Sequence, residues 1–194
     1  MSLFLSVQEL YISCAEYIDR KGGIFMTRKM KYSEYGGFLF TVAAGTLFHF
    51  LYEWCNENDL IALFTPVNES TWEHLKLLFF PVLFYSIPQY FLTGKEYRNF
   101  ITAKLTGAVV GMITITAFFY TYTGIIGQNY LFMDIVTFIL GAAACYLLSG
   151  YLIAKQPDFR FPCVINLLIL ALILFLFFFY TFAPPQIPLF ISPV

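Results

Sequence analysis

Charged residues are scarce in this sequence, and their scarcity argues against an ordinary soluble domain. Asp, Glu, Lys and Arg make up 12% of the 194 residues, whereas a globular domain carries roughly a quarter. Hydrophobic residues make up 59%, and phenylalanine alone occurs 24 times. A soluble chain this short cannot cover so much apolar surface. Because the formal net charge is only −1, nothing indicates a basic surface for nucleic acid, and we expect no nucleic-acid partner.

Motifs that would name a reaction are also missing. The four cysteines are scattered, with no C-x-x-C pair, so we expect no disulfide framework. The sequence has no H-E-x-x-H zinc motif and no c-type haem attachment motif. It also has no internal repeat of the kind common in transporters. Any functional site must therefore combine side chains from separate segments.

Long apolar stretches are the main positive feature of the sequence. A bilayer core of about 30 Å requires about 20 apolar residues in a helix. Five stretches meet this requirement: Tyr35–Trp54, Trp72–Leu92, Phe100–Tyr122, Tyr130–Ala154 and Phe161–Phe182. The sequence therefore predicts an all-α integral membrane bundle of about five transmembrane helices, in which residues 26–194 form a single transmembrane domain. The lipid bilayer is the predicted partner, and an oligomer is compatible with the pattern.

The basic residues predict how this bundle is oriented. Ten of the eleven Lys and Arg fall on one side of the predicted spans, and Lys76 is the exception. By the positive-inside rule that side is cytoplasmic, with the N-terminus inside and the C-terminus outside. The other side carries the acids Glu53, Glu57, Asp59, Glu69, Glu73 and Asp134. Their charge favours a cation near the outer face.

Residues 1–25 precede the predicted domain and end in the sequence Arg-Lys-Gly-Gly, shortly before Met26. One codon choice for that tetrapeptide is a purine-rich ribosome-binding sequence, at the usual distance from a start codon. We hypothesise that natural translation starts at Met26. The alternative is an amphipathic helix on the membrane surface, with Leu3 and Leu10 toward lipid. A secretory signal is not indicated, because the basic residues follow the apolar part.

Small residues indicate which spans pack together, because helices in lipid meet through small side chains. They recur every four residues at Gly37, Thr41 and Gly45, at Gly107 and Gly111, and at Gly141 and Cys145. We therefore expect the first, third and fourth spans to pack closely. The fifth span is unbroken apolar sequence over residues 167–179, so we expect it to be peripheral.

The densest polar patch is Pro66–Lys76, with the sequence P-V-N-E-S-T-W-E-H-L-K. Ser70 and Glu73 match the capping box that starts a helix. Trp72 is suited to an anchor at the membrane interface, and Lys76 to snorkelling outward. These roles do not account for the other polar residues of the patch.

Polar side chains from several spans gather near the predicted outer helix ends: His49, Glu53, Asn68, Glu69, Glu73, His74 and Asp134, with Tyr120 and Tyr122 at the rim. Ionisable groups in a membrane domain indicate function. One hypothesis is a metal-dependent hydrolase acting on a lipid or lipid-linked substrate. The ligands of a divalent ion such as zinc would be His49, Glu53, His74 and Asp134. The catalytic groups would be Glu69 and Glu73, and the substrate-binding groups Asn68, Tyr120 and Tyr122.

Other hypotheses remain open at this point. A Ser70–His74 pair would suggest a nucleophile and its base. The acidic outer side permits a protein that binds or transports a cation or small solute, and the two histidines permit haem ligation. The polar cluster also permits a non-catalytic structural or partner-binding subunit. The sequence does not decide whether Leu60–Phe64, which is too short to span, dips into the bilayer.

The motifs of this sequence resemble an uncharacterised family of small bacterial polytopic membrane proteins. The similarity rests on Gly45–Trp54, on the signature P-V-N-E-S-x-W-E-H-L-K and on Tyr120–Gly124, and it covers roughly residues 34–182. The resemblance implies a multi-pass protein of the bacterial cytoplasmic membrane. It assigns no activity.

Overall fold

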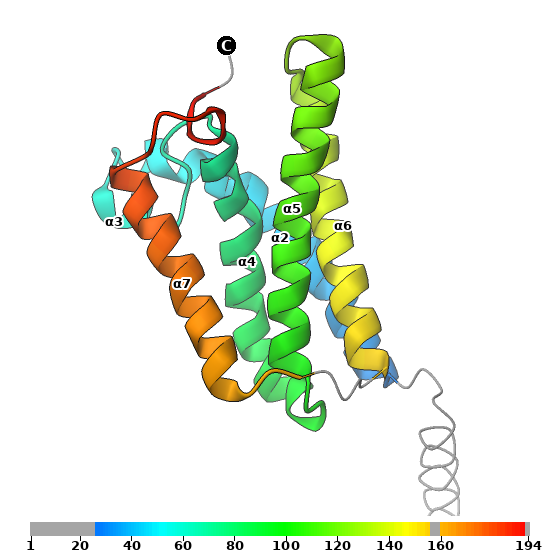
Figure 1. The fold of residues 1–194 in the computed structure, drawn as a ribbon. Coiled ribbons are helices and arrows are strands. Elements are labelled where there is room, and N and C mark those ends of the chain that lie inside the picture. Colours follow the sequence, from blue (N-terminus) through cyan, green and yellow to red (C-terminus); the bar gives the residue numbers. More distant parts are fainter. Residues whose placement is uncertain (1–25, 156–159, 193–194) are drawn as a thin grey trace, which may run out of the picture.

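Five long helices dominate the computed structural model, which describes residues 26–155 and 160–192 (Figure 1). They are α2 (Arg28–Trp54), α4 (Thr71–Leu92), α5 (Phe100–Ile126), α6 (Leu131–Lys155) and α7 (Cys163–Phe182). Each is long and apolar enough to cross a membrane. The described residues contain no strand. The prediction of an all-α bundle of about five membrane-crossing helices is therefore confirmed, and the orientation of the termini stays a prediction.

Three short helices mark the two ends of the bundle. They are α3 (Asp59–Ala62), η1 (Gly94–Glu96) and η2 (Pro188–Phe190). The end that carries α3, the start of α4 and the end of α7 is called the α3 end below, and it is uppermost in Figure 1. The opposite end, where α4 runs through η1 into α5, is called the η1 end. Residues 1–25 lie outside the described residues. The two hypotheses about this segment, a natural start at Met26 and a helix on the membrane surface, therefore stay predictions.

Helices α5 and α6 pack closely through glycine. A Cβ added at Gly107 would lie 2.6 Å from the carbonyl oxygen of Cys145, and one added at Gly111 would lie 2.8 Å from that of Gly141. Such distances are too short for any side chain, so the backbones approach only because glycine is present. The expected contact between the third and fourth spans is confirmed.

Helix α2 packs against α4 and α6 through its own glycines. A Cβ at Gly37 would lie 2.5 Å from the Tyr146 ring and 2.7 Å from the Tyr85 ring. A Cβ at Gly45 would lie 2.5 Å from the Phe138 ring. The small face predicted for the first span therefore receives aromatic rings from α4 and α6. The sequence pattern identified this face correctly, and the contact of the first span with the fourth is confirmed. The expected close packing of the first span against the third is wrong, because α4 and not α5 lies against α2.

Helix α7 lies at the edge of the bundle, as expected (Figure 1). Only 11% of its most apolar stretch is buried. Its buried contacts include Phe177 and Thr181 near the α3 end. Near the η1 end, Asn166 Nδ2 donates a hydrogen bond to Thr102 Oγ1 at 3.0 Å. The helix is thus attached to its neighbours at both ends.

The segment between α2 and α4 enters the bundle. The Phe64 ring packs against the rings of Phe80, Phe84 and Phe178, at centroid distances of 5.1, 6.0 and 6.0 Å. Phe80 lies nine residues beyond the start of α4, or roughly 13 Å along the helix axis. Phe64 therefore packs among helices that are long and apolar enough to cross a membrane.

Lys76 holds this inserted segment in place, and the prediction that it snorkels outward is wrong. Its side chain is fully buried. Nζ donates to the carbonyl oxygens of Ala62 and Thr65 at 2.9 and 3.3 Å. It also lies 2.7 Å from Glu73 Oε2 and 2.6 Å from Thr181 Oγ1. The inserted loop buries carbonyl groups away from water, and these need a donor inside the protein. The Lys76 ammonium group supplies this donor, which is why its side chain points into the protein.

Candidate functional site

Two histidines meet at the α3 end of the bundle. His49 comes from the last part of α2, and His74 from the first turn of α4. Their Nε2 atoms are 3.2 Å apart. The Glu69 carboxylate, in the loop just before α4, places Oε2 3.7 Å from His49 Nε2 and 3.4 Å from His74 Nε2. Three potential metal-ligand atoms therefore converge from two helices and a loop.

A hydrogen bond of His74 indicates which of its ring nitrogens carries a proton. Its Nδ1 lies 2.9 Å from the carbonyl oxygen of Ser70. A carbonyl oxygen can only accept a hydrogen bond, so Nδ1 carries a proton, and in the neutral ring the lone pair is then on Nε2. That lone pair is available on the side of His49 and Glu69. Metal-binding histidines are commonly oriented in this way, with one ring nitrogen donating to a carbonyl group.

The start of α4 positions both His74 and Glu69. Ser70 Oγ accepts a hydrogen bond from the Glu73 N–H at 3.4 Å, which is the predicted N-cap. The other half of the predicted capping box is absent. The Ser70 N–H donates instead to Asn68 Oδ1 at 2.9 Å, and Glu73 Oε2 accepts from the Val67 N–H at 3.0 Å. The loop around Glu69 is therefore braced on both sides.

The spacing of the three atoms suits a tetrahedral metal ion. Two nitrogen or oxygen ligands about 2.1 Å from a tetrahedral zinc ion lie roughly 3.4 Å apart. The three observed separations are 3.2, 3.4 and 3.7 Å. The side chains of His49 and His74 are 34% and 29% exposed, and that of Glu69 is 65% exposed. The centre is therefore open on one side to water or to a substrate.

A pocket of about 170 Å³ adjoins this centre. Its walls come from the α3-end portions of α4, α5 and α6, and from the loops beside them. Glu69 and His74 line it together with Asp134 and Asn129, and its apolar wall includes Phe119. The pocket therefore joins the histidine cluster to polar and apolar surface within one space.

Several predicted site residues lie outside the group of three. Glu53 is exposed at the end of α2, one turn or about 6 Å beyond His49 along the axis. Asp134 lines the adjoining pocket and accepts a hydrogen bond from the Tyr122 hydroxyl. Tyr120 is partly exposed on α5. Among the described residues, the acid that converges with the two histidines is Glu69, and Glu53 and Asp134 lie outside that group.

Glu73 and Asn68, which the sequence suggested as a catalytic and a substrate-binding residue, both form hydrogen bonds at the start of α4. The carboxylate of Glu73 is 2% exposed and forms an ion pair with Lys76. Asn68 uses its side-chain oxygen on the Ser70 N–H. Both groups support the local structure at the start of α4. The Glu73 carboxylate is enclosed there, whereas Asn68 is exposed and its substrate-binding role stays a prediction.

A buried ionic network near the η1 end was not predicted. Lys104 Nζ and Glu34 Oε1 are 2.6 Å apart. The same carboxylate accepts from Gln89 Nε2 at 2.6 Å and from Ser149 Oγ at 2.8 Å. The four side chains come from four helices and are all buried. A signal was present, since Glu34 and Lys104 are opposite charges near the same end of two spans.

Comparison with known proteins identifies a family for this chain but no individual relative. Residues 26–194 match a family of unknown function, DUF6512. No curated protein and no solved structure matches the chain. This result is in line with the resemblance to an uncharacterised family, whereas the bacterial source and the signature string remain predictions. Because the matched region covers most of the sequence, the chain belongs to the DUF6512 family of unknown function.

Proposed function

We propose that this chain is a metal-dependent membrane enzyme in which His49, His74 and Glu69 hold a divalent cation such as zinc. The observation that carries the proposal is the triangle of 3.2, 3.4 and 3.7 Å between their ligand atoms. Two histidines and a carboxylate form a common ligand set of catalytic zinc, whose fourth position is open to water. A bound metal would lower the pKa of that water and supply hydroxide for hydrolysis.

The adjoining pocket supports a lipid or lipid-linked ester or phosphate as the substrate. It combines polar groups, such as Asp134 and Asn129, with apolar side chains such as Ile115 and Phe119. It also lies at the end of helices that are long enough to cross a membrane. An amphiphile can place its reactive group at the metal while its chain stays against the apolar wall. If the basic side is cytoplasmic, the substrate enters from the outer leaflet.

Asp134 is the proposed general base in place of Glu73. Its carboxylate lines the same pocket as His74 and is not one of the three ligand groups. The Tyr122 hydroxyl donates to it, which orients the carboxylate. A carboxylate beside metal-bound water can take the proton that leaves as the water attacks. Glu73 cannot do so, because it is buried against Lys76.

Metal analysis of the full chain tests the binding step. Wild-type protein, purified in detergent without chelator at near-neutral pH and equilibrated with zinc, should retain about one zinc ion per chain. His49→Ala and His74→Ala should each lose it. Glu53→Gln is the matched control, because Glu53 is an acid on the same helix outside the group of three. Wild-type protein that retains no zinc, nickel, cobalt or manganese would overturn the proposal.

A separate assay tests the chemistry. Zinc-loaded protein in liposomes should release product from a phospholipid or lipid-linked phosphate, and a chelator should abolish this. Asp134→Asn should keep its zinc but lose about 10²–10⁴-fold in turnover, the usual contribution of a general base. Zinc binding without hydrolysis of any such lipid would contradict the enzymatic role. Flux of labelled cations into liposomes would then test the alternative, a cation-binding or transport protein.

A further inference from the structure

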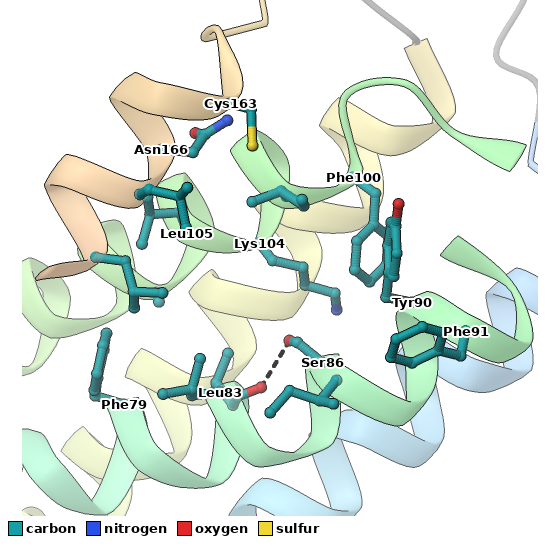
Figure 2. Close-up of a pocket in the computed structure, with 16 residues that line it drawn as sticks. Phe79, Leu83, Ser86, Tyr90, Phe91, Phe100, Lys104, Leu105, Cys163 and Asn166 are labelled. Carbon is teal, nitrogen blue, oxygen red and sulfur yellow. Dashed lines mark hydrogen bonds between the residues drawn. The ribbon is translucent and has the colours of Figure 1, made fainter. Parts of the chain in front are cut away.

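A second pocket lies in the other half of the bundle, between α4, α5 and α7 (Figure 2). Its volume is about 240 Å³, well above the roughly 150 Å³ of an engineered apolar cavity that takes up benzene. Figure 2 shows Phe79 and Leu83 of α4 facing Leu105 of α5 across this space. It is thus large enough for a segment of hydrocarbon chain.

Three polar side chains of the pocket wall, those of Ser86, Lys104 and Asn166, already have partners. Ser86 Oγ donates to the carbonyl oxygen of Val82 at 2.7 Å (Figure 2). Lys104 Nζ is paired with Glu34, and Asn166 is bonded to Thr102. A polar ligand would find few groups to replace its hydration inside the pocket. The lining therefore selects an aliphatic occupant.

The wall of the pocket includes exposed apolar side chains on two of the long helices. Leu167 of α7 and Ile87 of α4 line it, and their side chains are 58% and 53% exposed on the lateral surface of the bundle. Both helices are long and apolar enough to cross a membrane. Hydrocarbon chains of the surrounding lipids are the molecules that meet such an opening.

Cations lie at the η1 end of this opening. Lys95 Nζ is 4.9 Å from the ring centroid of Phe91, which lines the pocket. Arg98 is exposed between η1 and α5, and Arg160 is exposed three residues before Cys163, another lining residue. Basic positions beside grooves between membrane helices are typical sites for anionic lipid head groups. The cations therefore suit an anionic head group, and the apolar pocket suits the hydrocarbon chain of the same lipid.

We propose that this pocket binds one acyl chain of an anionic phospholipid, whose phosphate lies among the exposed cations at the η1 end. The lipid would fill the space between α7 and its neighbours, at the end where α7 is held mainly by Asn166. It is a second site, at the opposite end of α4 from the histidine cluster. It does not rest on the metal proposal, and either can fail alone.

Lipid binding to the full chain in detergent micelles tests this proposal. The protein would be titrated with phosphatidylglycerol and, separately, with phosphatidylcholine, and bound lipid would be counted by native mass spectrometry. The wild type should retain one phosphatidylglycerol in preference to phosphatidylcholine. Leu167→Trp should fill the pocket and reduce binding at least tenfold. Leu168→Trp is the matched control, because Leu168 is an exposed neighbour on α7 that does not line the pocket.

A charge variant tests the head-group contact without altering the pocket. Lys95→Gln should weaken phosphatidylglycerol binding about fivefold, the effect of one cation near an anionic head group. Lys31→Gln, an exposed lysine on α2 at the same end, should change nothing. Equal wild-type affinity for the two lipids would overturn the anionic specificity. Normal binding by a Leu167→Trp protein that elutes and melts like the wild type would overturn the pocket.

Discussion

Single side chains decide what each end of this bundle can do. At the α3 end, the Ser70 carbonyl holds the His74 ring so that Nε2 faces His49 and Glu69. Glu69 is the least buried of the three, so in the proposed metal centre it would be a ligand whose side chain contributes little to the packing of the fold. Its replacement therefore separates metal binding from stability.

Glu69→Gln is expected to weaken zinc affinity at least about tenfold, because a neutral amide replaces the one anionic ligand. The measurement is competition for zinc with a chelating dye, using purified protein. Glu57→Gln is the control, since Glu57 is also an exposed acid in the same loop region. Thermal unfolding of both metal-free variants should match the wild type. Unchanged zinc affinity in Glu69→Gln would remove Glu69 from the ligand set.

Lys76→Met is expected to destabilise the protein by about 3–5 kcal/mol, because it leaves the buried Glu73 carboxylate unpaired. The carbonyl groups of Ala62 and Thr65 would also lose their donor. Chemical unfolding in detergent measures this change. The double variant Lys76→Met, Glu73→Gln should recover part of the loss, since no charge is then stranded. A Lys95→Met control, at an exposed position, should stay close to the wild type; a similar loss there would argue against a specific role for Lys76.

Helix α4 is the element that connects the features of this protein. Its first turn carries His74, Lys76 lies in the next turn, and its last turns line the apolar pocket. Helix α2 reaches α4 through glycine, which lets His49 approach His74. Helices α5 and α6 form the other closely packed pair, and their ends complete the pocket beside the metal centre.

Gly107→Ala is expected to cost about 1–3 kcal/mol of stability, because the new Cβ would lie 2.6 Å from the Cys145 carbonyl oxygen and force α5 away from α6. Gly124→Ala, also in α5, is the matched control. A Cβ there meets nothing within 4 Å, so the change should be neutral or stabilise the helix by up to about 1 kcal/mol. Thermal unfolding in detergent compares the two. Equal stability of both variants would show that the α5–α6 contact tolerates a methyl group.

The whole molecule separates charge between its ends. Exposed cations gather at the η1 end, at Lys29, Lys31, Lys95, Arg98 and Arg160, with Glu96 as an exposed acid among them, whereas exposed acids gather at the α3 end, at Glu53, Glu57, Asp59 and Glu69. The proposed metal centre is at the acidic end, where a cation is favoured. The proposed anionic lipid is at the basic end. Both proposals thus follow the direction of the same charge asymmetry.

The positive-inside rule predicts that the α3 end faces outward. In a cysteine-free background, Glu57→Cys should react with a membrane-impermeant maleimide in intact cells. Lys95→Cys should react only after the membrane is permeabilised. Both positions are exposed, so accessibility within the protein does not distinguish them. The reverse labelling pattern would invert the orientation and place the metal centre on the cytoplasmic side.

Hydropathy alone determined the membrane architecture, because an apolar stretch long enough to cross a bilayer is a local property of the chain. Local patterns also identified the cap at Ser70 and the small faces of the helices. The meeting of His49, Glu69 and His74 depended on tertiary structure, because the ligand atoms belong to two helices and a loop whose relative rotation no local pattern encodes.

The side chain of Lys76 is the clearest example of a feature that local sequence patterns did not predict. Its sequence position near a helix start favours an outward side chain, and only the insertion of Phe64 and its loop creates the buried carbonyl groups that turn it inward. The network of Glu34 with Lys104, Gln89 and Ser149 likewise required four helices to meet. Sequence determined which residues form helices long and apolar enough to cross a membrane, and which polar residues lie on them. Packing decided which of those polar groups satisfy one another and which remain available to a ligand.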